Sequence, residues 1–178
     1  GVRGPKTLKR IRHGRIGNST FAQVISDPGL LISRLFSLKK VSEKKDIGYI
    51  IHGADREFFF ELFPEKKQDL INNYATYEDF LNQLSKYKTV ISSSLHGIIF
   101  CHSYGIPVCS IKITDKIMGN NFKYIDYYHS IGNKDFKGRH QVTKDTNFKN
   151  LIKNEYQPDK ENIENIKNIQ ENIIINSI

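Results

Sequence analysis

Several features that would assign this chain to a specialised class are scarce or absent. Its 178 residues include two cysteines, Cys101 and Cys109, and neither has a Cys or His at metal-ligand spacing. Both lie in apolar stretches, so we expect free buried thiols of a reducing compartment. A disulfide between them would require Cα atoms within about 7 Å of each other. The sequence therefore gives no indication of a metal site or a disulfide framework.

Long apolar runs are also missing. No stretch approaches the roughly 20 apolar residues that cross a bilayer, and residues 1–10 lack the apolar segment of a secretory signal. We expect a cytoplasmic protein. The chain is long enough for one domain or two small ones, and its 38% hydrophobic and 26% charged residues suit a soluble globular fold.

The positive charge is dispersed. The net charge is +8, but the lysines are scattered and form no compact basic block. Zinc-finger spacing and the aromatic-basic pattern of RNA-binding domains are absent, so we expect no nucleic-acid partner. Such a charge is compatible with anionic lipid or phosphorylated substrates, but a solvated basic surface explains it most simply.

Strand and helix patterns alternate along most of the chain. Asp27 followed by Pro28, and Thr76 with Asp79 three residues later, are typical of helix starts. The predicted strands are 24–26, 46–52, 71–74, 89–92 and 106–111, and the predicted helices are 29–36, 77–85 and 96–104. This alternation predicts an α/β fold with a doubly wound, Rossmann-like parallel sheet.

The remaining segments give weaker signals. Residues 54–70 fit a strand or a helix, 122–129 are aromatic and irregular, and 132–148 are polar and expected to form a loop. An amphipathic helix is predicted over residues 161–178, packing on the sheet through an apolar stripe of Ile163, Ile166, Ile169, Ile173 and Ile174. A membrane-surface role for this helix is the alternative.

The most informative stretch is residues 91–107, which reads as a strand end, a serine-rich turn and a helix that opens with His96 and Gly97. The N-terminus of a helix favours anions, and an imidazole there can move protons near neutral pH. His52 follows another predicted strand. Because ligands of parallel sheets bind at the carboxyl ends of strands, His52 and the turn at 92–96 are expected to share a pocket.

Five segments, in order, resemble those of the polysaccharide pyruvyl transferases. The similar segments are Val-Arg-Gly-Pro-x-Thr within 1–7, Asp-Pro-x-Leu-Leu within 26–31, the strand 47–52 ending in His, Ser-Leu-His-Gly…Gly-Ile-Pro within 92–107, and Lys-Tyr-Ile-Asp-Tyr-Tyr at 123–128. Together they are far more specific than any one alone.

The resemblance implies a glycosyltransferase-B-like fold of two Rossmann-like halves. This chain would be the C-terminal half, with residues 1–130 as the donor-binding domain and 131–178 as a polar loop and a helix packed on it. The family transfers the enolpyruvyl group of phosphoenolpyruvate to a sugar diol during exopolysaccharide or capsule synthesis, which gives a pyruvate ketal and phosphate. It needs no cofactor. Its acceptor is usually a carrier-linked saccharide, which implies a location at the inner membrane face.

The resemblance also suggests roles for residues. His96 would be the catalytic acid/base or a ligand of the phosphate, and Arg3 would hold a carboxylate or phosphate bidentately. Many relatives have Arg where this chain has Ser94, so either another cation, such as Lys112 or Lys123, replaces that charge, or the donor is held differently. The complete expected donor site is His96 with Arg3, His52, Ser93, Ser94, Leu95, Gly97 and Lys123, without a metal.

Two other readings stay open at this stage. A nucleotide-sugar glycosyltransferase of the same architecture would bind a diphosphate at the same helix N-terminus. A non-catalytic half-domain would instead dock a partner chain through its basic surface and its isoleucine-rich C-terminal helix. His96 itself could be a helix-capping histidine satisfied by backbone groups.

Overall fold

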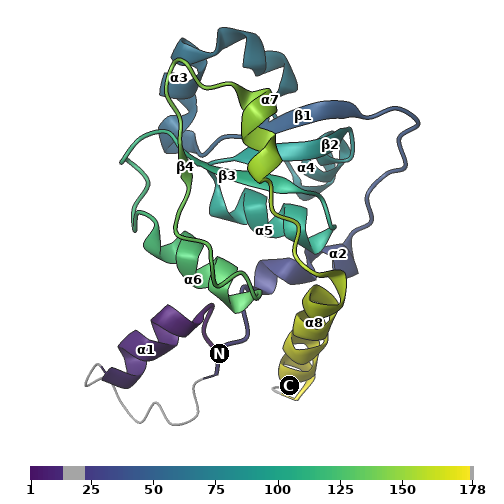
Figure 1. Cartoon of the computed structure of the whole chain (residues 1–178). Helices are drawn as coiled ribbons and strands as arrows, with labels where there is room; N and C mark the ends of the chain where they lie inside the picture. The colour runs from purple at the N-terminus through teal and green to yellow at the C-terminus, as the bar shows by residue number, and fades with distance from the viewer. Residues whose placement is uncertain (14–22, 177–178) are drawn as a thin grey trace.

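The computed structural model of this chain describes residues 1–13 and 23–176. Its centre is a parallel sheet with the strand order β1-β2-β3-β4 (Figure 1). The strands are β1 (Lys45–Ile50), β2 (Tyr87–Ser92), β3 (Val108–Lys112) and the short β4 (His140–Gln141). The expected α/β fold with a parallel sheet is therefore confirmed.

Helical segments connect the strands. Between β1 and β2 lie α3 (Gly53–Leu62), the 3-10 helix η3 (Pro64–Asp69) and α4 (Tyr77–Leu84); α5 (Leu95–Ser103) precedes β3, and α6 (Phe122–Ser130) precedes β4. Before β1 come α1 (Pro5–His13), η2 (Pro28–Leu31) and α2 (Ile32–Leu35). After β4 come α7 (Phe148–Leu151), η4 (Ile152–Asn154) and α8 (Lys160–Ile175).

The two faces of the sheet carry separate cores, because alternate strand residues point to opposite sides. Ile50 and Val90 join one cluster with apolar residues of α4, α5 and α6. Tyr49 and Ile91 join the other, with aromatic residues of α3 and α7. Helices therefore cover both faces, with α5 on one side of the strands and α7 on the other (Figure 1).

The predicted helix starts are confirmed. The Asp27 carboxylate accepts a hydrogen bond from the Gly29 N–H at 2.9 Å, although the first turn after it is a 3-10 helix that continues into α2. The Thr76 hydroxyl accepts from the Asp79 N–H at 3.2 Å and begins α4. These caps are local in sequence, which is why the pattern predicts them.

Three predictions of local structure are wrong. Residues 24–26 form no strand, since only Val24 makes an isolated bridge, to Val2. Residues 71–74 turn away after Ile71, because the Asn72 side chain accepts from the Tyr74 N–H at 3.1 Å. Residues 122–129 are helical within α6 rather than irregular. There, burial of tyrosines on one helix side overrides the weak helix propensity of aromatic residues.

The ambiguous segment 54–70 is helical, as α3 and η3, and the expected loop 132–148 contributes β4 to the sheet.

Helix α1 is capped by a residue of α6, which is far from it in the sequence. The buried Asp126 carboxylate accepts from the Lys6 N–H at 2.7 Å and caps the first turn of α1. A Cβ at Gly4 would collide with the Asp126 carbonyl oxygen. The glycine of the Val-Arg-Gly-Pro segment thus permits this close approach.

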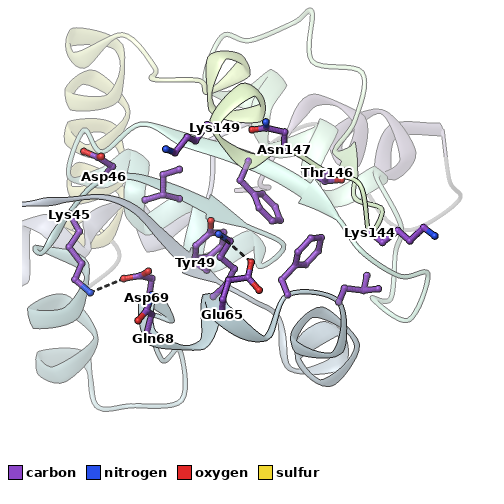
Figure 2. Close-up of a pocket in the computed structure, with 15 residues that line it drawn as sticks. Lys45, Asp46, Tyr49, Glu65, Gln68, Asp69, Lys144, Thr146, Asn147 and Lys149 are labelled. Atoms are coloured by element: carbon purple, nitrogen blue, oxygen red, sulfur yellow. Dashed lines mark hydrogen bonds and ion pairs between the residues drawn. The ribbon is translucent and has the colours of Figure 1, made fainter.

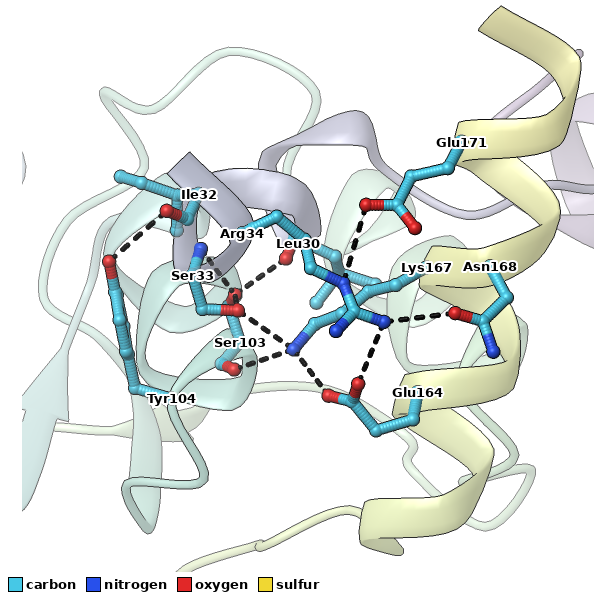
Figure 3. A network of polar contacts seen from close by, with 10 residues as sticks. All are labelled: Leu30, Ile32, Ser33, Arg34, Ser103, Tyr104, Glu164, Lys167, Asn168 and Glu171. Atoms are coloured by element: carbon cyan, nitrogen blue, oxygen red, sulfur yellow. Dashed lines mark hydrogen bonds and ion pairs between the residues drawn. The ribbon is translucent and has the colours of Figure 1, made fainter. Parts of the chain in front are cut away.

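Helix α8 is present, but its predicted apolar stripe is only partly correct. Ile163 is buried and Ile166 half-buried, whereas Ile169, Ile173 and Ile174 are exposed. Its buried side instead includes two polar residues, Lys167 and Gln170. The helix lies against η2, α2 and the end of α5 rather than on the sheet (Figure 3).

Candidate functional site

The carboxyl ends of β1 and β2 are joined by a compact set of hydrogen bonds. The Ser92 hydroxyl donates to the Ile50 carbonyl at 3.0 Å, and the Ser93 N–H donates to the same oxygen at 3.1 Å. The His52 N–H donates to the Ser93 hydroxyl oxygen at 3.0 Å. The two segments expected to form the site, around His52 and around Ser93, are therefore in direct contact.

Helix α5 begins at this junction. Ser94 is its N-cap, and the Ser94 hydroxyl accepts from the Gly97 N–H at 3.4 Å. A Cβ at Gly97 would lie 2.6 Å from Ile50 Cγ2 and 2.9 Å from Ser92 Oγ. Only glycine lets the helix pack this closely on the strand ends, which explains the glycine of Ser-Leu-His-Gly. The His96 side chain points outward and is exposed.

His52, Ser94, His96 and Gly97 line one cavity of about 240 Å³. Four aromatic residues also line it, Tyr74, Tyr77, Phe80 and Phe100. The structure thus brings the two predicted histidines together at the N-terminus of α5. The capping role considered for His96 belongs to Ser94, and no hydrogen bond to His96 is present in residues 1–13 and 23–176.

His52 is held in a defined orientation. Its Nδ1 accepts from the Ala54 N–H at 3.2 Å and caps α3, which assigns the proton of the neutral ring to Nε2. Partial burial lowers the pKa of His52, and the positive charges of Lys123 and Arg139 lower it further, against an opposing effect of Asp55. His52 is therefore neutral near pH 7.

Arg3 and Lys123 are not among the residues that line this cavity, although the charge of Lys123 acts on His52. The Arg3 Nε forms an ion pair with the Asp27 carboxylate at 2.7 Å, which fixes the side chain while leaving it partly exposed. The pKa of Lys123 is lowered by partial burial and by the charges of Arg139 and Arg3. The mutual influence of these side chains shows that their charges gather in one region.

Two residues near this edge of the sheet, Arg139 and Asp55, are not predicted from the sequence. Arg139 is 7% exposed and lies immediately before β4, in the segment expected to be a loop. Asp55, fully buried in the first turn of α3, accepts a hydrogen bond from the Thr114 hydroxyl at 2.5 Å. No periodicity or motif marks either of them, since both are defined by long-range packing.

Other candidates have structural roles. Lys112 is paired with Asp115 at 2.6 Å, so it is not available to supply the charge of the absent arginine. The Leu95 side chain is in the core, which leaves only its backbone for a ligand. Cys101 and Cys109 are buried free thiols, as expected, and burial raises the pKa of each, to about 12 for Cys109. Neither is an activated nucleophile.

A wider hollow of about 900 Å³ lies away from these residues, at the start of β1 (Figure 2). Tyr49, Phe63 and Phe148 are among its lining residues, and several of its charges are paired within it, including Lys45 with Asp69 at 2.8 Å. Because it is at the opposite end of β1 from His52, it does not share the groups at the carboxyl ends of the strands.

Two further properties bear on the class of protein. Among the residues that the structure describes, no group of three or more His, Cys, Asp or Glu side chains is placed to hold a metal ion. No helix of the described chain is long and apolar enough to cross a membrane.

The fold and the strand-end residues define a parallel α/β domain in which two histidines, His52 and His96, line one cavity beside the carboxyl ends of β1 and β2. Residues 1–115 match the family of polysaccharide pyruvyl transferases. The chain belongs to this family. The match includes Arg3, His52 and the turn with His96, and it ends before Lys123 and Arg139.

The chain is also 32% identical, over 114 residues, to an uncharacterized protein of Acanthamoeba polyphaga mimivirus. The similarity covers 61% of this chain and 40% of that protein's length. No solved structure matches the chain.

Proposed function

We propose that this chain supplies the donor-binding site of a pyruvyl transferase, which transfers the enolpyruvyl group of phosphoenolpyruvate to a sugar diol as a ketal. One observation carries the proposal. In a member of this family, the exposed His96 and the neutral His52 face one cavity at the N-terminus of α5. A proton-transfer group and an anion-binding element therefore occur together.

The charge of the site suits phosphoenolpyruvate, which carries a phosphate and a carboxylate. Arg3 and Lys123 supply positive charge, and the first turn of α5 supplies the oriented N–H group of Leu95, whereas the Gly97 N–H is bonded to the Ser94 hydroxyl. A Lys123 ammonium group held among other cations is stabilised when an anion enters. Binding of the donor would offset the repulsion between these cations.

The serines have different parts in this proposal. The Ser94 hydroxyl oxygen accepts from Gly97, and its own hydrogen stays available to donate to the phosphate at the cavity wall. Ser93 is fully buried and accepts from the His52 N–H. Ser93 therefore acts by positioning His52 rather than by touching the donor.

His96 would protonate the methylene carbon of phosphoenolpyruvate, which converts that carbon into a methyl group and makes the adjacent carbon electrophilic. One sugar hydroxyl adds to this electrophilic carbon, phosphate leaves with its oxygen, and the second hydroxyl closes the ketal. The two hydroxyls release two protons, of which one replaces the proton that His96 gave and the other goes to phosphate. Atoms and charge balance without a redox partner.

The acceptor is proposed to be a carrier-linked saccharide of a cell-surface polysaccharide, which would place the reaction at the inner membrane face. We further propose that the whole enzyme is glycosyltransferase-B-like and that residues 1–130 form its donor-binding domain. Residues 131–178 complete this domain, since β4 and Arg139 come from them.

Calorimetric titration of the chain with phosphoenolpyruvate tests the proposal. We expect saturable binding that weakens at least tenfold in His96→Ala and persists in His13→Ala, a matched change of an exposed histidine on α1. A parallel titration with a uridine or guanosine diphosphate sugar addresses the glycosyltransferase reading. Binding of the nucleotide sugar, with no binding of phosphoenolpyruvate, would refute the proposal.

A further inference from the structure

Arg139 has an unusual environment for a guanidinium group. Its side chain is 7% exposed, and its two terminal nitrogens are buried without a hydrogen-bond partner in the described part of the chain. Nε donates a hydrogen bond to the Asn121 side-chain oxygen at 3.0 Å. Guanidinium groups are almost never buried unless they are paired, because an unpaired buried charge is strongly unfavourable.

The position of Arg139 is fixed by α6. The guanidinium carbon lies 4.1 Å from the centre of the Tyr124 ring, and the Asn121 side chain that holds Nε is the N-cap residue of the same helix. The Tyr124 hydroxyl in turn donates to the Ser93 carbonyl at 2.6 Å. Tyr124 therefore links Arg139 to the turn that begins α5, with its ring against Arg139 and its hydroxyl bonded to Ser93.

The group around Arg139 is predominantly positive. The Lys123 ammonium lies 5.6 Å from the centre of the same Tyr124 ring, and the charge of Arg139 lowers the pKa of both Lys123 and His52. Asp55 is the acidic group that acts on His52 and Tyr124, but Asp55 Oδ2 also has no hydrogen-bond partner. Asp55 and Arg139 thus form no hydrogen bond with each other.

We propose that Arg139 is an oxyanion-binding residue of the donor site and holds a phosphate or carboxylate through its two free terminal nitrogens. The planar guanidinium, with both terminal nitrogens unpaired, can donate to two oxygens of such a group at once. A lysine ammonium matches this geometry less well. Arg139 then provides the guanidinium that Ser94 lacks, from a segment outside the residues that match the family. The identity of the anion as phosphoenolpyruvate rests on the proposed function, but the oxyanion site itself does not.

The test is titration of the chain with phosphoenolpyruvate and, separately, with inorganic phosphate. We expect at least tenfold weaker binding of phosphoenolpyruvate in Arg139→Gln and intermediate binding in Arg139→Lys. Lys137→Gln removes the same charge from an exposed position of the same segment and is expected to bind as the unmodified chain does. Equal affinity in Arg139→Gln and the unmodified chain would overturn the inference.

Thermal unfolding adds a second readout. Without an anion, Arg139→Gln should unfold at the same temperature as the unmodified chain or higher, since it removes an unpaired buried charge. Phosphate should raise the unfolding temperature of the unmodified chain but not that of Arg139→Gln. Equal protection of both would contradict the inference. If Arg139→Gln does not fold, Arg139→Lys decides: weaker binding supports the site and unchanged affinity overturns it.

The two proposals fail in different ways. Phosphate binding that requires Arg139, without binding of phosphoenolpyruvate, would support the oxyanion site and refute the proposed donor. Binding of phosphoenolpyruvate that needs His96 but is unchanged in Arg139→Gln would support the proposed donor and overturn the oxyanion site. A folded chain that binds neither anion would refute both.

Discussion

The backbone N–H of His52 donates a hydrogen bond to the Ser93 hydroxyl, with the nitrogen and oxygen 3.0 Å apart. This bond joins the residues that follow β1 and β2 and fixes the backbone of His52, which lines the same cavity as His96. Removing the Ser93 hydroxyl would leave the N–H of His52 without its partner. Stability and donor binding are therefore coupled at this position.

We expect Ser93→Ala to lower the free energy of unfolding by about 1–2 kcal/mol, the usual effect of leaving a largely buried donor unsatisfied. It should also weaken phosphoenolpyruvate binding several-fold, because His52 is no longer held. Urea denaturation and calorimetry measure the two effects. Thr89→Ala, in the strand that precedes Ser93, is the control and should leave binding unchanged. Unaltered stability and affinity in Ser93→Ala would show that the bond is dispensable.

Lys167 attaches α8 to the rest of the domain. It is 2% exposed, and its ammonium nitrogen lies 2.8 Å from Ser33 Oγ, 2.9 Å from the Ser103 carbonyl and 2.8 Å from Glu164 Oε1 (Figure 3). Lys167→Met keeps most of the apolar stem but leaves these acceptors unpaired. We expect it to lower the unfolding free energy by about 2–4 kcal/mol.

The control for this change is Lys160→Met, an exposed position on the same helix, which should alter stability by less than about 0.5 kcal/mol. Chemical denaturation followed by circular dichroism gives both values. Equal stability of the two variants would contradict the assigned role of Lys167.

His102 makes stability depend on pH. It is fully buried, its Nδ1 lies 2.9 Å from the Tyr127 hydroxyl, and burial lowers its pKa to about 3. In the unfolded chain a histidine binds a proton below about pH 6.5. Between these values the unfolded state binds more protons than the folded state, so stability is complete above pH 6.5 and falls as the pH decreases.

We expect the unfolding free energy to decrease toward pH 4 by up to about 1.4 kcal/mol per pH unit from this residue. His52, whose pKa is also lowered, adds to the same trend. Denaturation at several pH values should show a shallower slope in His102→Phe and an unchanged slope in His13→Gln, a change at an exposed position. An unchanged slope in His102→Phe would disprove this account.

The parts of the fold that sequence predicts are those determined locally. The buried strands at 46–52 and 89–92, and the caps at Asp27 and Thr76, depend on neighbours a few residues away. The proximity of His52 and His96 could also be predicted at this level, because both histidines follow strands of a parallel sheet. Topology alone then places them at the same edge.

The parts that sequence does not predict depend on contacts between distant segments. Asp126 accepts a hydrogen bond from Lys6, 120 residues earlier in the chain, and the buried ammonium group of Lys167 depends on Ser33 and Ser103. Arg139 lies in a polar stretch without periodicity, and its importance follows from Tyr124 and Asn121. Such positions have no signature in a single sequence, since long-range packing defines them.

The most direct test of the central claim is the NMR response of the six histidine ring signals to phosphoenolpyruvate. We predict saturable shifts of the His96 and His52 rings, with His13 and the buried His102 unchanged. The same titration of Arg139→Gln should need a higher donor concentration. Unperturbed His96 and His52 signals at saturating phosphoenolpyruvate, in a folded chain, would contradict the account.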